Sequence, residues 1–445
     1  MSETIVAIAS PPGMGAVSVI RLSGARAFKI AISVVRGEVL PKPRRVGLRS
    51  IQDDTGRVID EGLLITFEGP GSYTGEDVVE FTGHGGVMVT RRVLERFVEA
   101  GAIPAGPGEF TQRAFMNGRM DLTQAEAVMD LISAQTSLAL RSANEQLDGR
   151  LGRTCENIRA KLLGATAHLE AFIDFPEEDI DPEVGAALCR TLSEQSASIA
   201  GLLSTADQGR ILREGVRTVI FGKPNVGKSS LLNRLLGYQR AIVSSKEGTT
   251  RDTIEEVVNL RGIPLRLIDT AGVRESSDEI EQEGIAMTHG QLARADLVLV
   301  IWDLSESFVD SAEVSIPDGA RRLDILNKSD LEDVSWAGAK GLRISCESGS
   351  GFEDLESAIS KLLSLDEAQW GDHSVAVNAR HQACLTRAQS SLIKAITSLR
   401  AGDEPELTAL DLREALTAIG EIAGIVDTEE ILGCLLYTSD AADET

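Results

Sequence analysis

The chain has 445 residues, too many for one hydrophobic core, so we expect two or three domains. Its formal net charge of −24 excludes a broad basic face for nucleic acid, although it leaves room for a local basic patch. Five cysteines lie far apart without a C-x-x-C pair, which indicates neither a zinc site nor a disulfide framework. No apolar run has the length of a membrane span, and the N-terminus lacks a basic stretch followed by an apolar one, so we expect a cytoplasmic protein with no membrane partner.

The first 118 residues are predicted to form a separate α+β domain, because short β-type runs are broken by Gly and Pro. The predicted strands are Ile5–Ala9, Ala16–Leu22, Gly62–Phe67 and Val78–Thr82, and the predicted helix is Val87–Ala100. Two loops in this domain, Pro11–Gly15 and the segment from Tyr73 through Glu80 to Gly86, look specified for a function, although turn chemistry is the simpler interpretation of their Gly and Pro. His84 stands between two glycines and is interpreted as a turn residue rather than a ligand.

Two helical stretches flank a different kind of segment. Ile158, Leu162, Ala165, Leu169 and Phe172 follow one another at steps of three or four residues, and so do Leu385, Ala388, Leu392, Ala395 and Leu399. This spacing predicts helices that pack lengthwise on other helices. We therefore expect an all-α domain in two parts, residues 119–212 and 366–432, with an α/β nucleotide domain of residues 213–365 inserted between them.

The nucleotide domain is predicted from the stretch Gly222–Ser229, which has the spacing G-x-x-x-x-G-K-[ST]. It follows the apolar run Val216–Phe221 and precedes a helix-like segment, as a phosphate loop requires. Glycines let backbone N–H groups approach phosphate oxygens, Lys228 neutralises the outer phosphates, and the Ser229 hydroxyl can bind Mg²⁺. A Gly-rich turn before an ordinary helix is the alternative interpretation.

Three downstream motifs follow in the order expected of a GTPase. The motif Asp269–Gly272 ends the strand-like run Pro264–Ile268 and brings a carboxylate toward Mg²⁺. Before it lies a switch-like segment from which we assign the Thr250 hydroxyl to Mg²⁺ as well. Asn327-Lys328-Ser329-Asp330 follows the strand-like run Leu323–Leu326, and the Asp330 carboxylate can accept two hydrogen bonds from guanine, whereas adenine would leave it unpaired.

A final segment, Ser345-Cys346-Glu347, follows the strand-like run Leu342–Ile344, where a backbone N–H would meet guanine O6. The residues predicted to contact GTP from these motifs are Asn225, Val226, Gly227, Lys228, Ser229, Ser230, Gly248, Thr249, Thr250, Asp269, Thr270, Ala271, Gly272, Asn327, Lys328, Asp330, Ser345, Cys346 and Glu347.

The catalytic machinery departs from the commonest pattern. Many GTPases carry Gln after the D-T-A-G motif to orient the attacking water, but this chain has Val273, which can neither donate nor accept a hydrogen bond. Arg251 and Arg274 flank the site, and either is equally consistent with an arginine finger or a solvated residue. The Asn225 side chain could help to hold a monovalent cation near the phosphates, although any residue is compatible with its position in the motif.

Taken together, several motifs resemble the MnmE family of tRNA-modification GTPases, also called TrmE. They are G-K-P-N-V-G-K-S-S-L-L-N, E-G-T-T-R-D, D-T-A-G-V-R-E-S-S-D-E-I-E, P-P-G-x-G, T-G-E-D-V-V-E-F-T-G-H-G-G and P-G-E-F-T-Q-R-A-F-M-N-G-R-M-D-L-T-Q-A-E-A. The resemblance covers residues 1 to about 432. It implies a homodimer with an N-terminal tetrahydrofolate-binding and dimerisation domain, a helical domain, and an inserted Ras-like G domain activated by K⁺-dependent dimerisation.

The resemblance also implies a reaction and a partner. With the flavin-dependent protein MnmG (GidA), in a heterotetramer, the family forms a 5-carboxymethylaminomethyl or aminomethyl group on the wobble uridine, U34, of certain tRNAs. The implied carbon donor is 5,10-methylenetetrahydrofolate, for which 5-formyltetrahydrofolate is a binding analogue.

Carried over by position, the family's site residues fall into three groups. Arg21, Glu80 and Arg119 are implied to bind folate, with Arg119 standing where the family often has Lys. Glu281 is implied to orient the attacking water through an intermediary, beside the catalytic contributions of Lys228 and Thr250. The implied K⁺ site includes Asn225 together with Ser244, Lys246 and Thr249 of the loop Ser244–Thr249. This loop also adds Ser244, Ser245, Lys246 and Glu247 to the predicted nucleotide contacts.

The last residues differ from the family. Members end in F-C-[IV]-G-K, but Asp440 stands where the cysteine is expected, and Cys434 is one residue past the matching Gly433. We therefore treat residues 433–445 as an atypical tail and expect GTP hydrolysis to survive and tRNA modification to be impaired.

Two other functional classes stay open at this point. The chain could be a regulatory GTPase switch of the ribosome-assembly type, without tRNA chemistry, and folate binding by residues 1–118 would argue against that class. A scaffold with a degenerate nucleotide site is disfavoured, because Lys228, Ser229, Thr250, Asp269 and Asp330 are all present.

Overall fold

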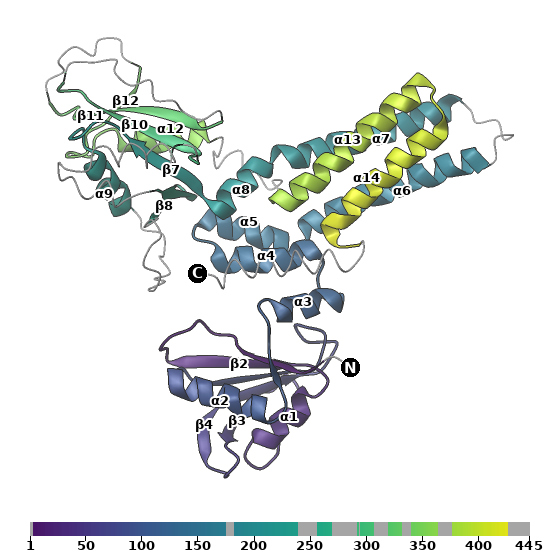
Figure 1. The fold of residues 1–445 in the computed structure, drawn as a ribbon, viewed down its shortest axis with the longest axis vertical. Coiled ribbons are helices and arrows are strands. Elements are labelled where there is room, and N and C mark those ends of the chain that lie inside the picture. Colours follow the sequence, from purple (N-terminus) through teal and green to yellow (C-terminus); the bar gives the residue numbers. More distant parts are fainter. Residues whose placement is uncertain are drawn as a thin grey trace. The chain divides into compact units, whose positions relative to one another are not determined.

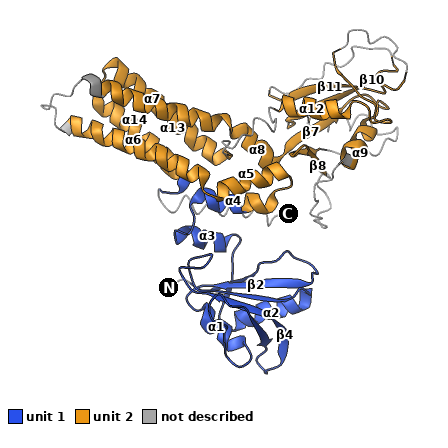
Figure 2. Ribbon diagram, turned by 180° about the vertical axis from the view of Figure 1, so that it is seen from behind, with its two compact units in different colours: residues 1–128, 423–445 blue, residues 129–422 orange. Residues whose placement is uncertain are grey.

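The computed structural model describes residues 3–174, 182–238, 256–268, 292, 294–306, 319–331, 340–363 and 376–425. Figure 2 divides the chain into two compact units. Unit 1 takes in the chain as far as Val128 and again from Ala423, and unit 2 runs from Met129 to Ile422. The five-segment division made from the sequence is finer than this and stays a prediction.

Unit 1 contains a six-stranded sheet in the order β3-β4-β5-β2-β1-β6 (Figure 1). Its strands are β1 (Ile5–Ile8), β2 (Val17–Ser23), β3 (Gly47–Gln52), β4 (Val58–Phe67), β5 (Val78–His84) and β6 (Ile103–Pro104). All neighbours are antiparallel except β1 and β6, which run parallel. The four strands predicted from the sequence are confirmed, each within a few residues, and β3 and β6 were not predicted.

The core of unit 1 lies between this sheet and two helices, α1 (Ala27–Val34) and α2 (Val87–Glu99). Residues such as Ile20, Leu22 and Phe81 alternate with outward-facing neighbours along their strands, so one face of the sheet is apolar. The other face is left for polar side chains and a candidate binding site. This arrangement confirms the predicted α+β class.

The helices α3 (Glu109–Met116), α4 (Leu122–Ser133) and α5 (Ser137–Leu147) follow the sheet. The sequence predicts an all-α domain from residue 119, and two breaks separate α4, α5 and the helix that follows them. Thr136 caps the N-terminus of α5, where its side chain accepts a hydrogen bond from the Ala139 backbone N–H. Gly149 then takes a φ of 77°, which favours glycine and separates α5 from the next helix.

Four long helices of unit 2 form a bundle: α6 (Arg150–Asp174), α7 (Pro182–Ser204), α13 (Ala379–Ala401) and α14 (Pro405–Ala423). The predicted apolar positions Ile158, Leu162, Leu385 and Leu392 are all buried in one shared core. Since α6 and α7 precede the nucleotide-binding part and α13 and α14 follow it, the prediction of an α/β domain inserted into a helical one is confirmed.

The inserted part contains a second six-stranded sheet in the order β12-β11-β10-β7-β9-β8. Its elements are β7 (Val216–Phe221), α9 (Lys228–Tyr238), β8 (Glu256–Leu260), β9 (Ile263–Leu267), β10 (Leu297–Asp303), β11 (Arg321–Asn327), β12 (Leu342–Arg343) and α12 (Phe352–Leu362). All neighbours are parallel except β8 and β9. This is a doubly wound α/β sheet, and the strand predicted over Val216–Phe221 matches β7 at both ends.

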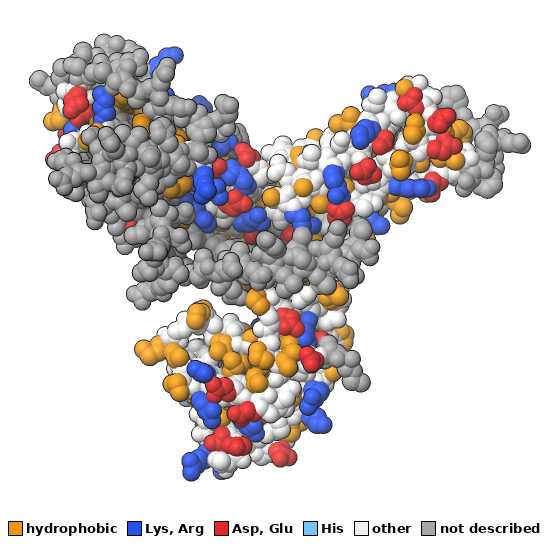
Figure 3. All heavy atoms as spheres, viewed as in Figure 1, with side chains coloured by type: hydrophobic (Ala, Val, Ile, Leu, Met, Phe, Trp, Pro, Cys, Tyr) orange, Lys and Arg blue, Asp and Glu red, His pale blue; other side chains and the backbone are white. Residues whose placement is uncertain are grey.

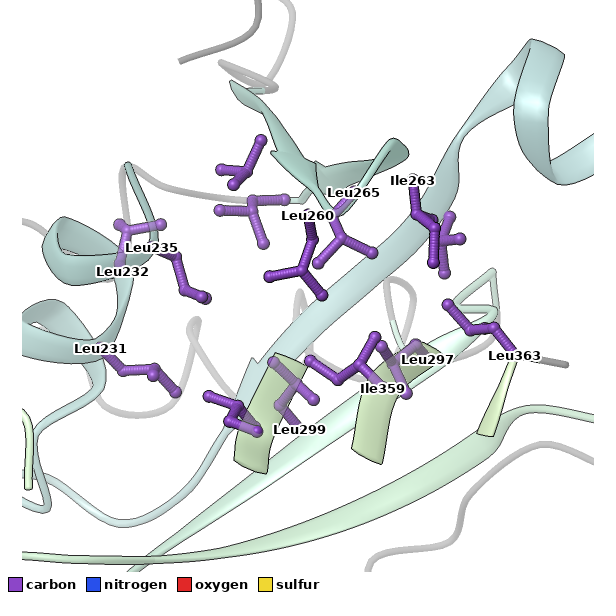
Figure 4. Close-up of a cluster of buried hydrophobic side chains, with 14 of the residues drawn as sticks. Leu231, Leu232, Leu235, Leu260, Ile263, Leu265, Leu297, Leu299, Ile359 and Leu363 are labelled. Atoms are coloured by element: carbon purple, nitrogen blue, oxygen red, sulfur yellow. The ribbon is translucent and has the colours of Figure 1, made fainter. Parts of the chain in front are cut away.

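The core beneath this sheet joins α9 and α12 to the strands (Figure 4). Leucines of α9, among them Leu231 and Leu235, pack with Leu265 of β9, Leu299 of β10 and residues of α12. The same core also takes in side chains of α5 and of α8 (Ala206–Glu214), which are helices from outside the sheet. Within the described chain, no helix is both long and apolar enough to pass through a membrane.

Candidate nucleotide-binding and one-carbon sites

The segment between β7 and α9 has the backbone of a phosphate-binding loop. Asn225 and Gly227 both have positive φ angles, 62° and 103°, so the chain turns sharply just before α9 begins at Lys228. A Cβ at Gly222 would lie 2.6 Å from the Ile301 carbonyl oxygen, which requires glycine there. The loop thus delivers its backbone N–H groups and the positive end of a helix to one place, the arrangement that binds phosphate.

Lys228 contributes the charge of this loop. Its ammonium donates hydrogen bonds to the carbonyls of Gly222 at 2.7 Å and Lys223 at 3.2 Å, so it bridges the start of the loop. Burial lowers the pKa of Lys228, which means that its charge is poorly compensated by solvent. An anionic phosphate would supply that compensation, and Ser229 and Ser230 follow in the first turn of α9.

Asn327 joins the phosphate loop to the predicted base-binding motifs. It ends β11 and is 2% exposed. Its side-chain amide donates to the Val226 carbonyl at 2.9 Å, while its side-chain oxygen accepts from the Cys346 backbone N–H at 3.1 Å. Three segments predicted separately from the sequence therefore meet at one side chain. Parallel strands β7, β10 and β11 all end at this edge, where ligands of doubly wound sheets bind.

The remaining residues of the predicted base site lie around this point. Asp330 is exposed in the turn that follows Lys328, and Ser345 is buried, with its hydroxyl accepting from the Ser348 backbone N–H. Burial raises the pKa of the Cys346 thiol to about 11, so this cysteine is neutral at physiological pH and is no nucleophile. Its backbone N–H, rather than its sulfur, is the group suited to a base.

One neighbouring carboxylate was missed from the sequence. Asp303 ends β10, directly opposite Asn327 in the parallel register, and forms an ion pair with Lys328. The signal was available, because the buried run Leu297–Asp303 ends in an acidic residue at the carboxyl edge of a predicted parallel sheet.

Part of the predicted site lies outside the described residues. This applies to Ser244, Ser245, Lys246, Glu247, Gly248, Thr249, Thr250, Asp269, Thr270, Ala271, Gly272 and Glu281. The assignments of Mg²⁺ to Ser229 and Thr250, of K⁺ to Asn225 and the following loop, and of the attacking water to Glu281 stay predictions. The atypical tail from Gly433 also lies outside the described residues.

A second candidate site lies on the open face of the unit 1 sheet. Arg21 on β2 is paired with Glu80 on β5, with 2.8 Å between the guanidinium Nε and the carboxylate. The guanidinium also lies over the rings of Tyr73 and Phe110, 5.3 Å and 5.6 Å from their centroids. Each of the paired side chains is about a quarter exposed, 27% for Arg21 and 24% for Glu80, so a ligand can reach both.

Arg119 borders the loop between β4 and β5, which carries Tyr73. Its side chain lies against Gly75, where an added Cβ would be 3.3 Å from the Arg119 Cγ, and Gly75 is two residues beyond Tyr73. The third predicted folate residue is therefore placed beside the segment that covers Arg21, although no direct contact joins the two arginines in the described structure. The sequence did not single out Arg113, which pairs with Glu76 at 3.0 Å and Glu109 at 2.7 Å beneath this loop.

Comparison with known proteins covers nearly the whole chain. A family model described as "GTP-binding protein TrmE N-terminus" matches residues 4–119, and one described as "MnmE helical domain" matches residues 122–435. A tRNA modification GTPase MnmE of Akkermansia muciniphila is 50% identical over 437 residues, 97% of each chain. Relatives with the same name from Opitutus terrae, 44% identical over 98% of each chain, and from Aquifex aeolicus, 40% identical over 98% of this chain and 99% of the relative, match equally broadly.

Proposed function

The chain belongs to the MnmE (TrmE) family of tRNA modification GTPases, and we propose that it uses GTP hydrolysis to drive a modification of the wobble uridine in tRNA. The observation that carries this proposal is the convergence of the phosphate loop, Asn327 and Cys346 at one sheet edge. Guanine and the phosphates would bind to segments that these hydrogen bonds join, so loss of the γ-phosphate can change the position of the whole site. The product is a 5-carboxymethylaminomethyl or aminomethyl group on U34.

The residues of the nucleotide site divide the chemistry of hydrolysis. The Lys228 ammonium neutralises the outer phosphates, and the loop N–H groups hold their oxygens. Ser229 and Thr250 would hold Mg²⁺, which would supply positive charge to the phosphates. Glu281 orients the attacking water through an intermediary, which compensates for Val273 at the usual glutamine position.

Potassium dependence separates this proposal from a regulatory switch of the ribosome-assembly type. We expect GTP turnover to rise at least about tenfold in KCl over NaCl at equal ionic strength, because a cation held by Asn225 and the loop Ser244–Thr249 would replace an arginine finger. Asn225→Ala should abolish the difference between the two salts. Turnover that is the same in both salts would favour the switch.

The unit 1 site supports folate as the carbon donor. Glu80 can accept hydrogen bonds from the amino and ring N–H groups of a pterin, and Arg21 is held between two aromatic rings that limit its movement. In our proposal this site binds 5,10-methylenetetrahydrofolate, with Arg119 as a further contact. The flavin-dependent partner MnmG (GidA) would complete the reaction on tRNA in the cytoplasm.

Folate binding can be tested at Arg21. We expect Arg21→Gln to weaken binding of 5-formyltetrahydrofolate at least about tenfold, because it removes a charge-assisted interaction at a partly buried site. Isothermal titration of the full chain would measure the dissociation constant. Arg91→Gln is the matched control, since the Arg91 side chain is 71% exposed and its ion pair is with Glu95, one helical turn away in the same helix. Equal affinity of the Arg21 variant and the unaltered chain would contradict the assignment.

The surface of unit 1 supports a homodimer as the working form. Met14 and Met88 are 90% and 69% exposed, and Val17 and Val87 are also exposed. The Gly15 N–H donates to the Gly85 carbonyl and the Gly85 N–H donates to the Ala16 carbonyl, which brings the segment with Met14 and Val17 beside the segment with Val87 and Met88. Figure 3 shows hydrophobic side chains gathered on this unit at the level of β2. An apolar patch of this kind is typical of a protein interface. In our proposal the homodimer then binds MnmG and forms a heterotetramer.

A further inference from the structure

Asp303 is a buried carboxylate beside the nucleotide site that none of the predicted roles uses. The residue is 5% exposed, and its side chain accepts hydrogen bonds from the backbone N–H of Ser305 at 2.9 Å and the hydroxyl of Ser305 at 2.6 Å. The Lys328 ammonium donates to its other oxygen. Asp303 is thus held on one side by Ser305 and itself holds Lys328 on the other.

The ionised state of Asp303 follows from these partners. Burial alone would raise the pKa of this carboxyl, but the hydrogen bonds from Lys328 and Ser305 outweigh burial and lower the pKa below its usual value. The carboxylate therefore carries its charge at neutral pH. Its attraction for the Lys328 ammonium is strengthened by the low dielectric of its surroundings.

Lys328 is fixed at both ends as a result. Its backbone adopts a φ of 64°, unusual for a residue with a Cβ, because the chain turns there from β11 toward Asp330. Its ammonium is fixed by Asp303, while the side chain as a whole is 33% exposed. A lysine side chain loses much of its rotamer freedom when it is ordered, and this ion pair has already ordered Lys328 before a nucleotide binds.

We propose that Asp303 is a positioning residue for guanine binding: it holds Lys328 so that the methylene stem of the lysine forms a fixed wall of the base site. This inference rests on the proposed function, because it assumes that the Asn327–Asp330 motif binds guanine. The wall contacts the base and not the phosphates. Asp303 therefore raises the affinity for GDP and for a non-hydrolysable GTP analogue by the same factor, without changing the hydrolytic step.

The test is a double-mutant cycle on the full chain, with dissociation constants measured for GDP and the GTP analogue. Asp303→Asn, which keeps the shape and removes the charge, is expected to weaken both ligands roughly tenfold, the equivalent of the ordering cost that the pair removes. In a Lys328→Met background the same substitution should change affinity less than about twofold. At saturating GTP, kcat should be unchanged while KM rises.

Control variants keep the outcomes distinct. Asp324→Asn removes a carboxylate from the neighbouring strand β11, where it accepts from Trp302 and Arg322, and should leave nucleotide affinity unchanged. Ser305→Ala removes one hydrogen bond to the Asp303 carboxylate and should therefore weaken nucleotide binding two- to threefold. This variant replaces Asp303→Asn in the test if Asp303→Asn has a lower melting temperature than the unaltered chain.

Three results would overturn the inference. They are equal affinity of Asp303→Asn and the unaltered chain, the same loss in both Lys328 backgrounds, and a lower kcat with no change in KM. If the unaltered chain itself fails to bind GDP, the proposed function fails instead. The two failures are therefore distinguishable in one experiment.

Discussion

Replacing Gly227 by alanine is expected to weaken GDP and GTP binding at least about a hundredfold. Gly227 has a φ of 103°, a conformation that costs other residues about 1–3 kcal/mol. A Cβ there would also overlap the side-chain amide of Asn327, which donates to the Val226 carbonyl. The substitution therefore strains the phosphate loop and pushes away the residue that ties the loop to the base site. Titration with a fluorescent guanine nucleotide would measure the loss.

A second glycine of the same region provides the matched control. Gly237 lies in α9, and a Cβ added there would meet no atom of the described chain within 4 Å. Gly237→Ala should therefore leave nucleotide affinity unchanged and raise stability by roughly 0.5–1 kcal/mol through helix propensity. Nucleotide binding by Gly227→Ala within threefold of the unaltered chain would show that this loop does not hold the phosphates.

Asp330→Asn should change which base is bound. The carboxylate is expected to accept two N–H groups of guanine, and hydrogen bonds to a charged group contribute about 1.5–3 kcal/mol each. An amide can accept only one of them, so GDP affinity should fall roughly 10- to 10²-fold. The amide can instead donate to the 2-carbonyl of xanthine, so xanthosine diphosphate should gain affinity.

Competition between GDP and xanthosine diphosphate for the variant and the unaltered chain measures this exchange. Because Asp330 is exposed, the substitution should leave the melting temperature nearly unchanged. A variant that still prefers guanine to xanthine by the original factor would remove Asp330 from the base site.

Elements with strong local signals were predicted closely from the sequence. Both boundaries of strand β7 were predicted correctly, because the apolar run Val216–Phe221 stops at Gly222, which the following loop requires. Strand β9 was predicted one residue late. The missing information was the hairpin with β8, in which Arg261 and Gly262 both have positive φ angles and begin the strand earlier.

Contacts between distant segments could not be predicted in the same way. Arg21 meets Glu80 because β2 and β5 pair in one antiparallel register, and no local pattern specifies that register. His84 looked like a turn residue between glycines, yet it ends β5 and its ring lies 2.6 Å from the Asp60 carboxylate. Asp303 was missed for the same reason, since its role depends on an ion pair with Lys328, the residue that follows the adjacent strand β11. The folate-binding roles of Arg21 and Glu80 were predicted from the resemblance to a family and not from these pairings.

The core of the inserted sheet has a consequence for dissecting the molecule. Leu138 of α5 lies against Gly262, and Ile211 and Leu212 of α8 belong to the same cluster as the strand leucines. A fragment cut at the sequence-derived boundary, residue 213, would begin just after two of its own interior side chains and would lack Leu138 altogether. The fragment would expose to water the apolar surface that these side chains cover in the intact chain. An excised GTPase fragment should therefore be more prone to aggregate than the intact chain. Its behaviour in isolation would be a poor guide to the parent molecule.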